Sequence, residues 1–250
     1  MIELQNIDVI FNQGTEIENH VLKGINLKVC DSQFVSIIGG NGAGKSTLMN
    51  VLSGNIFPNK GKILIDGFDV TKIPTESRSS MVSRVFQDPT IGTFADLTIE
   101  ENMALALKRG LKRGCSSSLN ENSRDKFKLV LATIGIGLED RLKDKVSLLS
   151  GGQRQALSLM MATLLGSKIL LLDEHTAALD PKIAKQIMKL TGQIIRQNKL
   201  TALMITHSMS QALEYGNRTI MMYHGKIVRD MEGDERKKLS TNDLIKYFDL

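Results

Sequence analysis

The feature that most constrains the fold is a glycine-rich run that directly follows a short apolar segment. The apolar segment covers residues 34–38, and the run reads Gly39-Gly40-Asn41-Gly42-Ala43-Gly44-Lys45-Ser46 before an amphipathic stretch over residues 46–52. Strand, glycine loop and helix in this order predict a phosphate-binding loop, whose backbone N–H groups turn toward phosphate oxygens at the positive end of the helix. In such a loop Lys45 reaches the β- and γ-phosphates, and the Ser46 hydroxyl is offered to Mg²⁺.

Two acidic residues follow another apolar segment, residues 169–172. Asp173 and Glu174 then stand at the carboxyl end of a buried strand, where open α/β sheets place their ligands. A carboxylate there can hold Mg²⁺, and its neighbour can take a proton from an attacking water. Beside a phosphate loop, this pair indicates a nucleotide-hydrolysing site.

The order of the segments favours an α/β fold. Residues Ile2–Phe11, 21–29 and 61–67 are rich in β-branched residues and read as strands, the first two antiparallel. From residue 93 to 150 the strand pattern is absent, while residues 98–108 and 120–134 have helical periodicity. Short apolar strands then alternate with helices, which is typical of a parallel sheet covered on both faces. The segments concerned are 169–172, 182–196, Thr201–Ile205, 211–215 and 220–223.

Composition places the chain among globular proteins. Of its 250 residues, 42% are hydrophobic and 24% charged, and no run approaches the roughly 20 apolar residues that span a bilayer. The first residues lack an export pattern, so we expect a cytosolic protein. Cys30 and Cys115 lack metal-type spacing, and we expect both to be reduced thiols.

The net charge of +5 is partly local. One basic cluster holds Lys108, Arg109, Lys112 and Arg113, and a second holds Arg236, Lys237 and Lys238. Each fits a solvated face, or a surface that docks an acidic partner or an anionic membrane. Direct nucleic-acid binding is not expected, because aromatic residues make up only 4% and none interleave with the basic clusters.

A second run that caps a helix separates this chain from other phosphate-loop proteins. In Leu149-Ser150-Gly151-Gly152-Gln153, Ser150 can cap a helix that starts near Gly152, which gives a second anion-binding helix N-terminus. The sequence leaves open whether both N-termini bind one ATP within a monomer. Together with the phosphate loop about a hundred residues earlier, this run resembles the ATP-binding-cassette (ABC) family, over nearly the whole chain.

The resemblance implies a specific architecture. It is an α/β phosphate-loop NTPase core with a parallel sheet, joined by an N-terminal antiparallel β subdomain and an inserted helical subdomain. On this chain the core and the antiparallel part cover residues 1–92 and 151–250. The helical subdomain covers residues 93–150 and ends in the signature run.

The resemblance also implies roles for the site residues. ATP is bound by the loop Gly39, Gly40, Asn41, Gly42, Ala43, Gly44, Lys45, Ser46 and Thr47, with Phe11 stacked on adenine, and in trans by Ser150, Gly151, Gly152, Gln153 and Asp180. Mg²⁺ is held by Ser46, Gln87 and Asp173. Glu174 is the general base, His207 is a switch histidine on the γ-phosphate, and Gln87 senses the γ-phosphate and Mg²⁺; Lys45 completes the catalytic set. For Phe11 a place in the core is the alternative.

Two positions carry further expectations. His175 departs from the family pattern, which usually has proline there; we interpret it as a lineage marker, with positioning of water as the alternative. Asp180-Pro181 fits a helix start with Asp as N-cap, and the resemblance adds a place at a dimer interface. Ser208 and Gln211 are spaced as a capping box.

The implied function is that of the ATPase subunit of an ABC transporter. Two copies pair head to tail, each signature run closing over the partner's ATP, and drive a separate transmembrane permease from the inner face of the cell membrane. The runs 85–89, 173–180 and 216–222 resemble a bacterial importer group assigned to tryptophan or tyrosine uptake with an extracellular binding lipoprotein. None of these residues touches an amino acid, so this substrate rests on association.

Two other function classes are weighed against it. One is a soluble ABC-type ATPase that acts on ribosomes or DNA, although such proteins carry paired cassettes or long coiled coils that this chain lacks. The other is a nucleotide-binding regulator without turnover, which the presence of Lys45, Asp173, Glu174 and His207 disfavours.

Overall fold

The computed structural model describes residues 1–111 and 119–247, in two compact units. Unit 1 combines Met1–Arg78 with Lys199–Leu250, and unit 2 is Ser79–Asn198. Lys112, Arg113 and Cys115 lie outside the described residues. Among the described residues, no helix is both long and apolar enough to cross a membrane.

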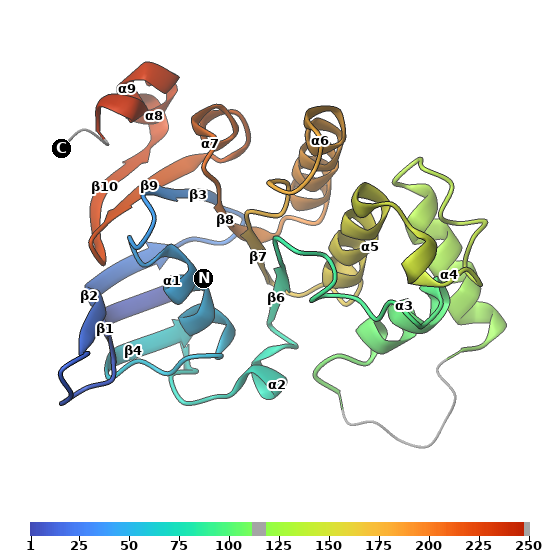
Figure 1. Cartoon of the computed structure of the whole chain (residues 1–250), viewed down its shortest axis with the longest axis horizontal. Helices are drawn as coiled ribbons and strands as arrows, with labels where there is room; N and C mark the ends of the chain where they lie inside the picture. The colour runs from blue at the N-terminus through green and yellow to red at the C-terminus, as the bar shows by residue number, and fades with distance from the viewer. Residues whose placement is uncertain (112–118, 248–250) are drawn as a thin grey trace. The chain divides into compact units, whose positions relative to one another are not determined.

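The first sheet of unit 1 is antiparallel, as predicted (Figure 1). Its strand order is β2 (Asn19–Val29), β1 (Ile2–Phe11), β4 (Lys60–Ile65) and β5 (Phe68–Asp69). Ile2 at the start of β1 pairs with Val29 on one side and Ile65 on the other, and all three are buried. The alternation of buried and exposed residues along β1 and β2 follows the period of two expected for a sheet with one face toward the core.

The second set of strands in unit 1 carries the glycine loop. β3 (Phe34–Gly39) pairs in parallel with β8 (Thr201–Ile205) and with β9 (Arg218–Tyr223), and β10 (Lys226–Glu232) runs antiparallel to β9. Every residue of β3 and β8 is buried, which explains their continuous apolar pattern. The helices of this unit are α1 (Lys45–Ser53), α2 (Thr75–Arg78), α7 (Met209–Tyr215), α8 (Gly233–Lys237) and α9 (Thr241–Lys246).

Unit 2 contains a parallel strand pair and a group of helices. β6 (Val82–Val85) pairs with β7 (Ile169–Asp173) in the register Val82↔Ile169. The helices are α3 (Ile99–Leu107), α4 (Glu121–Ala132), α5 (Gly151–Thr163) and α6 (Pro181–Gln197), with a 3-10 turn at Val146–Leu148. α5 contacts α3, α4 and α6, so the helix that follows the signature run forms the centre of this group (Figure 1).

A buried arginine in unit 1 holds the far end of the phosphate-loop helix. Arg78 is fully buried, and its Nη1 donates to the carbonyls of Val51 and Leu52 at 2.7 and 3.0 Å, at the carboxyl end of α1. Its Nη2 donates to the carbonyls of Val70 and Ile73. Burial lowers the pKa of Arg78 to about 10, so the guanidinium stays charged at neutral pH. A cation at this end of α1 complements the helix dipole and satisfies carbonyls that have no partner within the helix.

The two predicted basic clusters are not simply solvated faces. Arg109 is largely buried in unit 2, where it donates to the carbonyls of Ser79 and Ala162 and to the hydroxyls of Ser83 and Ser167. This burial lowers the pKa of Arg109. Arg236 in unit 1 donates to the carbonyls of Ala212 and Leu213 in α7 and to the Thr219 hydroxyl. One arginine of each cluster is therefore a structural donor.

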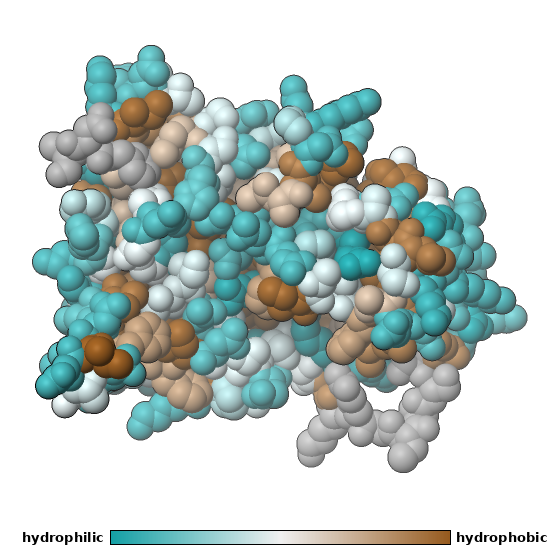
Figure 2. Space-filling model, viewed as in Figure 1, coloured by the Kyte–Doolittle hydropathy of each residue, from teal (hydrophilic) through white to brown (hydrophobic). Residues whose placement is uncertain are grey.

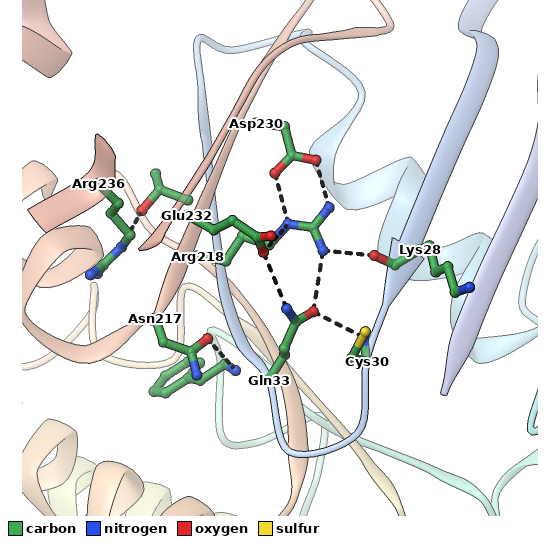
Figure 3. A network of polar contacts seen from close by, with 10 residues as sticks. Lys28, Cys30, Gln33, Asn217, Arg218, Asp230, Glu232 and Arg236 are labelled. Atoms are coloured by element: carbon green, nitrogen blue, oxygen red, sulfur yellow. Dashed lines mark hydrogen bonds and ion pairs between the residues drawn. The ribbon is translucent and has the colours of Figure 1, made fainter. Parts of the chain in front are cut away.

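The importer-like run 216–222 also has a structural role. Arg218 at the start of β9 donates two hydrogen bonds to the Asp230 carboxylate of β10 and one to the Lys28 carbonyl at 2.7 Å (Figure 3). The hydrogen bonds that Arg218 donates to the Asp230 carboxylate raise the pKa of Arg218. Asn217 Oδ1 accepts the Phe34 N–H at 3.0 Å, which fixes the start of β3 (Figure 3). These residues join the ends of β2, β3, β9 and β10.

On the face seen in Figure 2, brown apolar areas are small and are separated by hydrophilic residues. The described part of the chain has no buried cluster of three or more His, Cys, Asp or Glu side chains that could by themselves hold a metal. Cys30 is a free, exposed cysteine.

Candidate functional site

The glycine run in unit 1 forms the predicted turn between β3 and α1. Gly44 is the N-cap of α1 with φ of +96°, a left-handed conformation, and a Cβ at this position would lie 2.8 Å from Leu22 Cδ2. The left-handed backbone conformation favours glycine at this position. No side chain caps the amino end of α1, which leaves the helix N-terminus to backbone N–H groups alone. This geometry matches an anion-binding loop.

Lys45 is held inside the loop that precedes it. Its Nζ donates to the carbonyls of Gly39 and Gly40 at 2.8 and 2.9 Å, and the residue is buried. The ammonium is thus fixed over the loop by the loop's own backbone. The next residue, Ser46, is exposed at the amino end of α1. A fixed cation beside an open helix N-terminus can bind the phosphates of a nucleotide.

His207 lies at the same edge of the parallel strands as the phosphate loop. β3 and β8 pair in parallel from Phe34↔Ala202 to Ile37↔Ile205, so both chains leave the sheet at one edge. His207 is exposed in the loop after β8. Ser208 caps α7 by accepting the Gln211 N–H at 3.3 Å. The predicted capping box is only half formed, because the Gln211 side chain accepts the Thr206 hydroxyl proton at 3.0 Å instead.

Phe11 lies at the end of β1 with 37% of its surface exposed. The alternative that it belongs to the core is therefore wrong. An exposed ring at a strand end is free to stack on a base, and its contact with adenine stays a prediction.

In unit 2, two strands end side by side with polar residues. β6 and β7 are parallel, so exposed Gln87, two residues beyond β6, leaves the pair at the same edge as Asp173 and Glu174. Arg84 Nη2 donates to Asp173 Oδ2 at 2.5 Å, and its guanidinium carbon lies 4.8 Å from the centre of the Phe86 ring. Both charged side chains are largely buried. Arg84 was not predicted from the sequence, because its partner Asp173 lies on another strand 89 residues away.

The turn after β7 has an unusual backbone. Glu174 has φ of +46°, a left-handed conformation that costs a non-glycine residue about 1 kcal/mol. The turn is closed by the Ala177 N–H, which donates to the Glu174 carbonyl at 2.9 Å. His175 is only 1% exposed and its Nε2 lies 3.1 Å from Thr191 Oγ1 in α6. A ring buried in this way is not available to position water, so the structure argues against that alternative.

Asp180 and Ser150 cap the helices that follow them, as predicted. Asp180 Oδ1 accepts the Ile183 N–H at 3.1 Å, with Pro181 in the first turn of α6. Ser150 and Gln153 form a reciprocal capping box, so the Gln153 side chain is bound to the Ser150 N–H. α5 begins at Gly151, one residue earlier than expected.

Gly152 has a structural reason to be glycine besides any ligand. A Cβ at this position would lie 2.4 Å from Ile183 Cγ2, so the first turns of α5 and α6 approach closely. The signature run therefore serves the packing of unit 2 as well as the phosphate contact predicted for it.

Each residue predicted to bind magnesium offers an oxygen atom of a suitable kind. The predicted ligands are the Ser46 hydroxyl in unit 1 and, in unit 2, the Asp173 carboxylate and the Gln87 side-chain amide. All three offer hard oxygen atoms, and Mg²⁺ takes one or two protein ligands together with substrate phosphates.

The buried His175 predicts a pH dependence of stability. Burial lowers its pKa from 6.5 to about 4 in the folded chain, so between these values the unfolded chain binds a proton that the folded chain does not. The free energy of unfolding should therefore fall as the pH is lowered through this range, by at most about 1.4 kcal/mol per pH unit. His175→Gln should remove this contribution to the pH dependence of the free energy of unfolding, measured by urea unfolding between pH 4.5 and 7. His224→Gln, at an exposed position between β9 and β10 in unit 1, is the control and should leave the slope unchanged. Equal slopes for His175→Gln and the parent chain would contradict the prediction.

Comparisons with known proteins agree with this geometry. The family model described as ABC transporter matches residues 22–177. A tyrosine transport ATP-binding protein of Clostridioides difficile is 40% identical over 249 residues, which cover 100% of this chain and 99% of that protein. A thiamine import ATP-binding protein of Shigella flexneri is 36% identical over 85% of this chain and 87% of its own length. A dimeric ATP-binding cassette in a post-hydrolysis state, bound to ADP and Pi, has a TM-score of 0.79 and 30% identity over 93% of this chain and 98% of that one. The α/β fold with parallel core strands and an antiparallel sheet is thus confirmed, and the chain belongs to the ABC transporter family as an ATPase subunit.

Proposed function

We propose that the chain powers the import of an aromatic amino acid by hydrolysing ATP for a separate permease. The observation that carries the hydrolytic part is the loop around Lys45, in which a buried ammonium is fixed to the carbonyls of Gly39 and Gly40 beside an uncapped helix N-terminus. This arrangement suits the triphosphate of a nucleotide.

In the proposed reaction, water attacks the γ-phosphorus and the bond to the β–γ bridging oxygen breaks, releasing ADP and phosphate. Glu174 accepts a proton from the attacking water, while Lys45 holds the β- and γ-phosphates. His207 and Gln87 contact the γ-phosphate in this proposal. Mg²⁺, when bound by Ser46, Asp173 and Gln87, supplies neutralisation of the phosphate charge.

A second copy of the chain completes the proposed site. Ser150 caps α5, Gly152 lies in the first turn of α5 and Asp180 caps α6, and we assign all three to the surface that meets the partner's ATP. ATP then joins two copies and hydrolysis separates them. Support comes from the dimeric post-hydrolysis cassette with 30% identity to this chain.

The substrate and the partners rest on the relatives. The tyrosine transport protein matches the full length of the chain, and the thiamine relative is an import subunit as well. We assign this chain to a bacterial importer of tyrosine or tryptophan, docked on the inner face of the membrane and served by an extracellular binding protein. A soluble ATPase acting on ribosomes or nucleic acid is the competing class, and co-purification with ribosomes instead of a permease would favour it.

The first test concerns nucleotide binding. Lys45→Ala removes a charge-assisted contact to phosphate, so the affinity for a fluorescent ATP analogue should fall by about tenfold or more. Lys62→Ala, at an exposed position of β4 in the same unit, is the matched control and should bind normally. Unchanged affinity in Lys45→Ala would reject the phosphate-loop assignment.

The second test concerns the transported solute. Cells that carry Lys45→Ala in place of the parent chain should lose energy-dependent uptake of labelled tyrosine or tryptophan, because the permease is no longer driven. Uptake of labelled leucine is the internal control and should not change. Normal uptake of both aromatic amino acids would reject the substrate while leaving the ATPase assignment intact.

A further inference from the structure

The contact between His175 and Thr191 ties the turn after β7 to the middle of α6. His175 follows Glu174 directly, and its imidazole is almost fully buried. Thr191 is also fully buried, and its Oγ1 lies 3.1 Å from His175 Nε2. Because His175 is buried, a role at the surface of the protein does not explain why a histidine stands at this position.

The direction of this hydrogen bond follows from the other partner of Thr191. The Thr191 hydroxyl donates its single proton to the Ile187 carbonyl at 2.8 Å. The oxygen can therefore only accept from His175, so Nε2 carries the proton. The imidazole is thus a fixed donor in a single orientation.

The residue before it needs support from its surroundings. Glu174 is non-glycine with φ of +46°, and such a conformation persists only where neighbouring contacts hold it. On its amino side Asp173 belongs to β7 and is paired with Arg84. On its carboxyl side the first anchored side chain is that of His175. The left-handed turn is therefore held between a strand and a buried hydrogen bond.

We propose that His175 is a positioning residue for Glu174, acting through its hydrogen bond to Thr191. The bond fixes the peptide that follows Glu174 and so sets the direction from which its carboxylate reaches the reaction. This inference rests on the proposed role of Glu174 as the general base. His175 itself touches neither nucleotide nor water.

Three variants of the full chain test this proposal through ATP turnover and ATP affinity. His175→Leu removes the donor, Thr191→Val removes the acceptor, and His175→Gln keeps an N–H donor at similar reach. His175→Leu and Thr191→Val should each lower kcat about tenfold while the Kd for ATP changes less than about twofold, because a misplaced base affects the chemical step and not binding. The double variant should be no slower than either single variant, and His175→Gln should retain at least about half of the parent kcat.

Two further variants separate positioning from stability and from the role of Glu174. Phe127→Leu alters a buried side chain of α4 and should lower the melting temperature with kcat preserved. The inference is overturned if Phe127→Leu lowers kcat as much as His175→Leu does for the same loss of melting temperature. It is also overturned if His175→Gln is as slow as His175→Leu. Glu174→Gln tests the role of the base alone. If Glu174→Gln still hydrolyses ATP, Glu174 is not the general base. If Glu174→Gln is inactive but His175→Leu has the parent kcat, Glu174 remains the base and only the proposed role of His175 is rejected.

Discussion

The burial of parallel strands on both faces is the constraint on which the rest of the structure depends. β3 and β8 in unit 1 are buried throughout, and in the β6–β7 pair of unit 2 the charged residues are Arg84 and Asp173, which pair with each other. Polar chemistry is therefore confined to the carboxyl ends, where the chain leaves the sheet. The glycine loop and His207 share such an edge in unit 1, and Gln87 shares another with Asp173 and Glu174 in unit 2.

Buried arginines satisfy the backbone around these strands. Arg78 binds the carbonyl end of α1, and Arg109 binds carbonyls and hydroxyls in unit 2. Arg78 donates to four carbonyl oxygens and Arg109 to two, so each guanidinium links several backbone segments inside its unit. The guanidinium group suits this task because its donors are fixed in a planar fork. The phosphate-loop helix is thus held at one end by glycine geometry and at the other by a buried cation.

Sequence patterns predicted the elements whose burial is continuous or periodic. The strand ending at Gly39, the helix after Ser150 and the cap at Asp180 follow from local chemistry, and the structure has all three. β10 was missed because its residues are mostly exposed and lack an apolar pattern. Arg78, Arg84 and Thr191 were missed for another reason: each acts through a partner 16 or more residues away, which no short pattern records. For the same reason Arg109 looked like part of a solvated cluster.

The central claim is that the signature run serves the ATP of a second copy. Sedimentation velocity of Glu174→Gln with and without ATP and Mg²⁺ tests it most directly, since slow hydrolysis preserves the nucleotide that joins the copies. The account predicts a dimer with ATP and a monomer without it, and a monomer in both states once Lys45→Ala is added. A Glu174→Gln chain that binds ATP at saturation yet sediments only as a monomer would contradict the account.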